Sequence, residues 1–106
     1  MANDKLYCDH IRDAILKIES YVRGISFAEF EKNFLVQDGA IREFEIIGEA
    51  AKHLSLEFCA SHPEIPWKQV MSMRDRLVHE YFNVDTELVW TTIHNDLPAL
   101  KKAINS

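Results

Sequence analysis

The chain has 106 residues, of which 47% are hydrophobic and 27% charged, and this profile is typical of one globular domain with its own core. Its formal net charge of −5 argues against broad, charge-driven binding of nucleic acid, although a small basic site remains compatible with it. No apolar run approaches the ~20 residues that span a bilayer, and the polar first residues lack a signal-peptide pattern. We therefore expect a cytoplasmic protein without membrane association, folded as one domain over residues 1–106.

The first half of the chain is predicted to be helical. Apolar residues recur at helical spacing over residues 4–22, and Gly24 is expected to end that helix. Ser26 is a plausible cap for a short turn that follows. A long helix is then predicted from about residue 33 to residue 58, in which Gly48 would let another helix approach closely.

The second half continues the helical pattern after a loop at residues 61–66, which contains two prolines. A helix is predicted from about Trp67 until Asn83 breaks it. Thr86 is the expected N-cap of the last helix, which Pro98 should kink or restart. No stretch alternates with period two, so the predicted fold class is all-α, an up-and-down bundle of four to five helices.

The cysteines and histidines do not form a metal-binding pattern. Cys8 and Cys59 are far apart in sequence, and the five histidines show no paired ligand spacing. We therefore predict neither a metal nor another cofactor, and two free thiols in a reducing compartment.

The most informative segment runs from Met73 to Phe82 and contains the pattern Arg-x4-His-x-Tyr at Arg74, His79 and Tyr81. An arginine can hold a phosphate bidentately, and a histidine can move protons near neutral pH. If the segment is one helix, Asp75 lies one turn before His79 and could orient its imidazole, while Arg74 and Tyr81 share a neighbouring face.

On such a helix Arg74 and His79 would point ~140° apart, so one helix does not aim both at one atom. Either the helix loosens near His79, or a second copy of the chain completes the site across a dyad. Spacing alone more often indicates a solvated surface whose charged residues form i,i+4 pairs without further function.

The chemistry that matches this residue set is RNA cleavage without a metal. His79 could take the proton of the RNA 2′-hydroxyl as it attacks the neighbouring phosphate, or protonate the leaving oxygen. Arg74 would then neutralise the charge that develops on the phosphorus centre. DNA lacks the attacking hydroxyl and should not be cleaved.

Along almost its whole length the sequence resembles the HepT family of HEPN-domain proteins. The matching landmarks, in order, are Gln37-Asp38, Ala40–Arg42, Glu45–Lys52, Ile65–Trp67, Met73–His79, Tyr81-Phe82, Val84-Asp85, Val89-Trp90 and Asp96–Pro98. The departures are Asp75, where asparagine is common, and Ser72 and Glu80, where glycine is common.

This resemblance implies a dimerising helical bundle and a ribonuclease toxin with a metal-independent site in the dimer cleft. By position, Arg74 and His79 would be the catalytic pair and Asp75 a supporting polar residue. Tyr81 would be the site at which an antitoxin, a minimal nucleotidyltransferase of the MntA type, attaches AMP and thereby inactivates the toxin. The expected partners are RNA, this antitoxin and a second copy of the chain, with an oligomer larger than a dimer as the alternative.

An alternative hypothesis is a non-catalytic HEPN partner that binds a minimal nucleotidyltransferase or a nucleotide through the same polar face. The acidic balance of the chain and Glu80 beside His79 motivate it. A purely structural dimerisation module is a third possibility, but it leaves the grouping of Arg74, His79 and Tyr81 unexplained. Loss of RNA cleavage on mutation of His79 would separate the enzyme from both.

Overall fold

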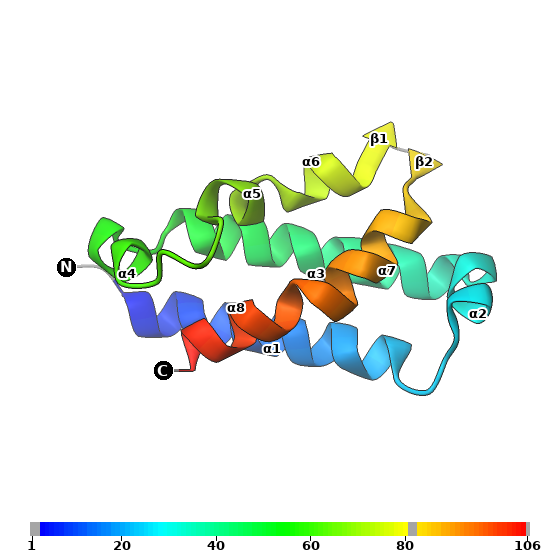
Figure 1. Cartoon of the computed structure of the whole chain (residues 1–106), viewed down its shortest axis with the longest axis horizontal. Coiled ribbons are helices and arrows are strands. Elements are labelled where there is room, and N and C mark those ends of the chain that lie inside the picture. Colours follow the sequence, from blue (N-terminus) through cyan, green and yellow to red (C-terminus); the bar gives the residue numbers. More distant parts are fainter. Residues whose placement is uncertain (1–2, 81–82, 106) are drawn as a thin grey trace.

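The computed structural model describes residues 3–80 and 83–105, with only the backbone described for His79 and Glu80. Its centre is a pair of long antiparallel helices, α1 (Asp4–Val22) and α3 (Phe34–Lys52), which lie side by side in Figure 1. Tyr21 packs on Gly39 near one end of the pair, and Tyr7 stacks on His53 at the other. These contacts fix the alignment of the two helices.

The shorter elements cover this pair. Two of them, α2 (Phe27–Lys32) and α4 (Leu56–Ala60), lie at opposite ends of the molecule, whereas α5 (Trp67–Met71) and α6 (Met73–Leu77) cross over α3 (Figure 1). An antiparallel hairpin of β1 (Val78–Glu80) and β2 (Asn83–Val84) follows. The last helices, α7 (Thr86–Asn95) and α8 (Leu97–Ile104), pack along α2, α3 and α1. The fold is thus mostly helical, as predicted, with this small hairpin as the exception.

The core forms where the apolar stripes of α1 and α3 meet the later helices. Its largest fully buried side chains come from six different elements, which shows that a single core joins the described chain. These side chains are Phe30, Phe44, Ile11, Ile15, Ile18, Ile47, Leu77, Leu97 and Val89. None of the helices in the described part of the chain is long and apolar enough to cross a membrane.

The helix boundaries confirm some sequence predictions and correct others. The first helix spans residues 4–22 as predicted, and Ser26 caps α2 through a capping box with Glu29. The predicted helix over residues 33–58 is wrong, because α3 ends at Lys52 and a separate helix begins after Ser55. The Ser55 hydroxyl accepts a hydrogen bond from the Phe58 amide at 3.0 Å, which starts the new helix.

For the C-terminal helices, one predicted boundary is wrong and another is confirmed. Asp85, not the predicted Thr86, is the N-cap of α7, since its carboxylate accepts a hydrogen bond from the Leu88 amide at 3.0 Å. Pro98 lies in the first turn of α8, where its missing N–H costs nothing, so the chain restarts a helix there as predicted.

Candidate functional site

The arginine of the motif is held at the surface by the two buried residues of α6. Met73 and Leu77 are one helical turn apart and point into the core, with exposed fractions of 3% and 1%. The residues between them, Arg74, Asp75 and Arg76, therefore face outward or lie at the edge of the core. Packing of these two side chains therefore fixes the short helix that carries the arginine.

The helix ends before it reaches the histidine of the motif, so the predicted continuous helix to residue 82 is wrong. Val78 is extended, with φ −123° and ψ 106°, and pairs with Val84 across the hairpin. The Asp85 amide also donates a hydrogen bond to the Leu77 carbonyl at 2.9 Å. A β-branched residue on each strand favours this extended pairing over another helical turn.

This change removes the helical argument for the contact expected between Asp75 and His79. The two residues are not one turn apart on a helix, because α6 ends at Leu77 and His79 belongs to β1. The face predicted for Arg74 and Tyr81 cannot be compared in the same way, because Tyr81 is not among the described residues. The backbone loosens before His79, which was one of the two possibilities left open by the sequence. The His79 side chain and all of Tyr81 lie outside the described residues.

Gly48 brings the arginine close to α3. A Cβ atom at Gly48 would lie 2.9 Å from the Met71 carbonyl oxygen and 3.3 Å from that of Val70, so a larger residue cannot fit without movement of the backbone. The end of α5 thus rests directly on α3, as the small residue in the sequence suggested. Arg74, three residues after Met71, is in this way placed over Glu45.

The Arg74 guanidinium lies between two carboxylates without closing on either. Its Nε atom is 3.8 Å from a Glu45 oxygen, and its Nη1 atom is 3.7 Å from an Asp75 oxygen. Both distances exceed the ~3.2 Å limit of a good N–H···O bond. Among the described residues the guanidinium makes no hydrogen bond, and 40% of the side chain is exposed. The described residues therefore leave its donors available to an anionic ligand.

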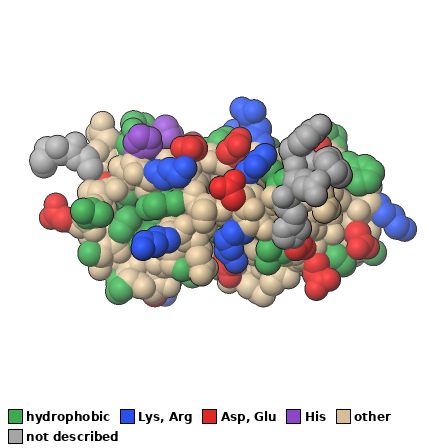
Figure 2. All heavy atoms as spheres, turned by 90° about the horizontal axis from the view of Figure 1, so that it is seen from above, with side chains coloured by type: hydrophobic (Ala, Val, Ile, Leu, Met, Phe, Trp, Pro, Cys, Tyr) green, Lys and Arg blue, Asp and Glu red, His purple; other side chains and the backbone are tan. Residues whose placement is uncertain are grey.

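A hollow of about 90 Å³ opens beside Arg74. It is lined by Phe44, Glu45, Gly48, Glu49, Lys52, Met71, Ser72, Arg74 and Asp75. Lys52 adds a second cation, held by Glu49 at 3.3 Å. The face of the molecule seen from above mixes acidic and basic side chains rather than forming a continuous basic patch (Figure 2). Any phosphate bound here would thus be held by local contacts.

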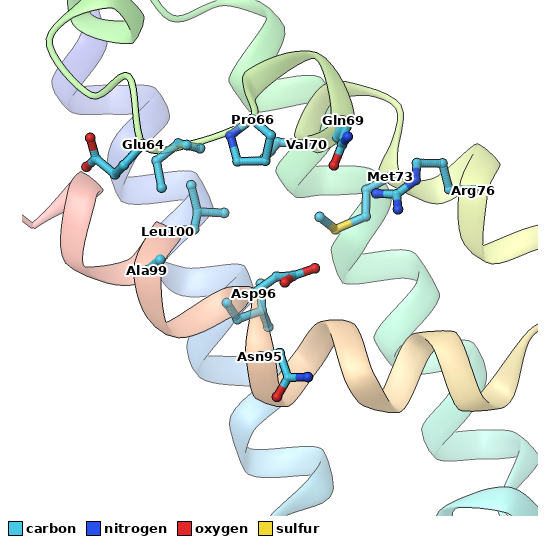
Figure 3. A pocket seen from close by; sticks show the side chains of 12 residues that line it. Glu64, Pro66, Gln69, Val70, Met73, Arg76, Asn95, Asp96, Ala99 and Leu100 are labelled. Atoms are coloured by element: carbon cyan, nitrogen blue, oxygen red, sulfur yellow. The ribbon is translucent and has the colours of Figure 1, made fainter.

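Arg76 lies on a different side of the motif helix. It lines a separate cavity of about 190 Å³ between the α5–α6 segment and the α7–α8 junction, where Asp96 also points inward (Figure 3). The floor of this cavity includes the buried residues Val70, Met73 and Leu100. Arg76 therefore does not join Arg74, although the two arginines are only two positions apart in sequence.

The residues that sequence reasoning missed are Glu45 and Lys52, which surround Gly48 on α3. The signal was available, because positions 45, 48, 49 and 52 follow helical spacing along one face. Within residues 3–80 and 83–105, no group of three or more metal-ligating side chains is close enough to hold a metal ion.

Comparison with known proteins places this geometry in context. A family model described as ribonuclease HepT-like matches residues 11–106. A protein of Thermococcus cleftensis named probable ribonuclease HepT is 44% identical over 97 residues, which cover 92% of this chain and 88% of that protein. A protein of Caldanaerobacter subterraneus, whose name proposes RNase activity, is 39% identical over 104 residues, covering 98% and 93%.

A longer protein of Methanocaldococcus jannaschii, named as a gamma-glutamylcyclotransferase with a proposed RNase function, is 42% identical over 100 residues, which make up 45% of its length. No solved structure matches the chain. The family model covers most of the chain, and the first two relatives align over nearly their full length. The chain therefore belongs to the HepT-like ribonuclease family.

Proposed function

We propose that this protein is a metal-independent endoribonuclease and the toxin of a toxin–antitoxin pair. The observation that carries the proposal is the half-exposed Arg74 guanidinium, whose donors are free of hydrogen bonds to the described residues and which lies at a hollow shared with Lys52. Two near full-length relatives whose names refer to ribonuclease activity support the choice of RNA as substrate.

The proposed reaction is transfer of the phosphate within the RNA strand. The 2′-hydroxyl oxygen bonds to the adjacent phosphorus and loses its proton to a base, and the bond from phosphorus to the 5′-oxygen breaks as that oxygen takes a proton. The products are a 2′,3′-cyclic phosphate and a 5′-hydroxyl end. Arg74 would hold a non-bridging oxygen and stabilise the charge that builds up there.

His79 is the proposed proton carrier, and a dimer would supply the second one. Because α6 ends at Leu77, the backbone at His79 belongs to β1 and not to the helix that carries Arg74. In a symmetric dimer with the two motifs facing across the dyad, the His79 of each subunit would serve one of the two proton transfers. Asp75 lies within 3.7 Å of Arg74, so it would help to position the arginine and not, as expected from the sequence, the histidine.

Regulation is proposed to act on Tyr81, two residues after His79. A minimal nucleotidyltransferase antitoxin would transfer AMP from ATP to the tyrosine oxygen, forming a phosphodiester and releasing pyrophosphate. The added negative charge and the bulky nucleoside, placed next to the motif, would exclude an RNA phosphate.

The decisive test is product analysis with RNA in the presence of a chelator. We expect wild-type protein to cleave and to leave 2′,3′-cyclic phosphate ends, whereas His79→Ala protein and fully 2′-deoxy oligonucleotides give no product. Intact mass should show AMP additions after co-expression with the antitoxin, and none on Tyr81→Phe protein. An unmodified wild-type protein that leaves a broad RNA panel intact would contradict the proposal and favour a non-catalytic binding partner.

A further inference from the structure

A second hollow lies next to the Arg74 hollow, on the other side of the same acidic residues. It has a volume of about 360 Å³ and lies between the N-terminal part of α1 and the C-terminal part of α3. Its lining residues are Tyr7, His10, Glu45, Ile46, Glu49, Ala50 and His53. Glu45 and Glu49 line both hollows, so the two are neighbours on the surface.

The hollow contains a prearranged group of aromatic rings. The His53 imidazole stacks on the Tyr7 ring, with centroids 4.8 Å apart and planes at 16°. His10 meets Tyr7 edge-on at 5.7 Å. Both histidines are exposed, and within the described chain Tyr7 is the one ring in contact with His53. Because His53 is exposed, a further flat ring can reach its imidazole from the solvent.

Two hydrogen bonds hold this stack in place. The Asp4 carboxylate accepts from the Ser55 amide at 2.8 Å and from the Ser55 hydroxyl at 2.7 Å. Asp4 begins α1, and Ser55 follows His53 by two residues, so the start of α1 is tied to the end of α3. This link joins the turn of α1 next to Tyr7 to the residues just after His53. Because it helps to hold the two rings in contact, a ligand would not have to order them itself.

The acidic residues connect the ring stack to Arg74. Glu45, Glu49 and His53 follow one another at four-residue intervals on or at the end of α3, so they form one stripe. The stripe is ~12 Å long at 1.5 Å per residue. Arg74 contacts its first residue, and the exposed His53 lies at its other end. A short single strand of RNA can reach from one to the other.

The chemistry of this stripe suits a particular base. Nucleobases of single-stranded RNA stack on aromatic and imidazole rings and are then read by hydrogen bonds to their edges. A carboxylate accepts, and guanine presents two adjacent N–H donors on its Watson–Crick edge. Uracil presents one N–H between two carbonyl oxygens, which a carboxylate repels. Glu49, one turn before His53, is placed to make this distinction.

We propose that the hollow around Tyr7 and His53 is a guanine-binding subsite for single-stranded RNA whose phosphate is held at Arg74. This inference rests on the proposed function, since it takes RNA to be the substrate. The carboxylates of Glu45 and Glu49 keep the phosphate backbone out of the aromatic hollow and leave it to Arg74 and Lys52. The base would thus bind on one side of the acidic stripe and the phosphate on the other.

The test is binding of uncleavable 2′-O-methyl RNA, measured by fluorescence anisotropy. The probes are an all-uridine oligonucleotide and a set in which one uridine is replaced by guanosine at each position in turn. We expect guanosine at one position to lower Kd by about tenfold, within the range of a single stacked base. His53→Ala and Tyr7→Leu should remove that preference, and Glu49→Gln should weaken it.

His94→Ala is the matched control, because His94 is also exposed and its ring also contacts an aromatic ring, Trp90, at 4.2 Å. It should keep the guanosine preference. Equal affinity of wild-type protein for all probes, with binding lost in Arg74→Ala, would overturn the subsite and leave the proposed function intact. Absence of binding to every probe would contradict both. A preference that survives in folded His53→Ala protein would also overturn the subsite.

Discussion

Replacement of Gly48 by alanine tests whether close contact between α5 and α3 positions Arg74. The new Cβ atom would lie 2.9 Å from the Met71 carbonyl oxygen and 3.3 Å from that of Val70, which are both backbone atoms. These atoms cannot rotate away, so the segment that carries Arg74 must shift. Overpacking of this kind costs about 1–3 kcal/mol, and alanine recovers up to ~1 kcal/mol through its higher helix propensity. We therefore expect a net loss of about 0–2 kcal/mol in the free energy of unfolding.

Gly39→Ala provides a control within the same helix. Its Cβ atom would approach only the Tyr21 ring, at 3.1 Å, and a side chain can adjust. This variant should have the same gain in helix propensity without the backbone collision. Urea unfolding, with equal m-values for the two variants, should place Gly48→Ala about 1–3 kcal/mol below Gly39→Ala.

The functional consequence separates positioning from simple destabilisation. At a temperature where both variants are fully folded, Gly48→Ala should lower kcat/KM for RNA by ten- to a hundredfold, because catalytic groups tolerate little displacement. Gly39→Ala should keep the wild-type value. A Gly48→Ala protein that is as stable as Gly39→Ala and cleaves RNA normally would refute the idea that this contact places Arg74.

Three further outcomes follow from named contacts. Glu45→Gln removes the carboxylate 3.8 Å from Arg74 and should tighten RNA binding a few-fold in low-salt anisotropy measurements. The control Glu57→Gln, at an exposed residue, should not change the affinity. Equal effects of the two variants would show that net charge alone is responsible. Asp4→Ala should lower unfolding stability by about 1–3 kcal/mol, since it deletes both hydrogen bonds to Ser55; an unchanged urea midpoint would contradict this. Burial, with a further contribution from Asp4, raises the pKa of the Cys8 thiol, so disulfide-exchange reagents should modify it slowly at pH 8 and faster as pH rises. Rapid modification of folded protein at pH 8 would contradict this reading.

Local sequence signals predicted the first half of the fold well. The apolar stripe of α1 and the cap at Ser26 each depend on residues within a few positions, and both appear as expected. Gly24, with φ +77°, also ends the first helical region as predicted. The break after Lys52 was missed, because the helical pattern continues through it and the N-cap role of Ser55 was not recognised.

The geometry around the motif was predicted only in part, because it depends on contacts between distant segments. The sequence analysis proposed Arg74 as a site residue, but it treated the motif as one helix and so placed Asp75 beside His79. The pairing of Val78 with Val84 ends that helix, and it could be foreseen only by weighing two short β-forming segments against a helical periodicity. Glu45 lies beside Arg74 because Gly48 admits the α5 backbone, a contact that spacing along the chain does not reveal.

The most direct test of the account is RNA cleavage in chelator by a matched pair of arginine variants. Arg74→Ala and Arg76→Ala remove the same charge from the same short helix, but Arg74 lies at the hollow with Lys52 and Arg76 lines a separate cavity. We expect Arg74→Ala to lower kcat/KM by at least a hundredfold, in the range seen when a charge-stabilising donor is removed, while Arg76→Ala stays within a few-fold of wild type. Equal losses in the two variants, or full activity in Arg74→Ala, would contradict the assignment of Arg74 as the phosphate-binding residue.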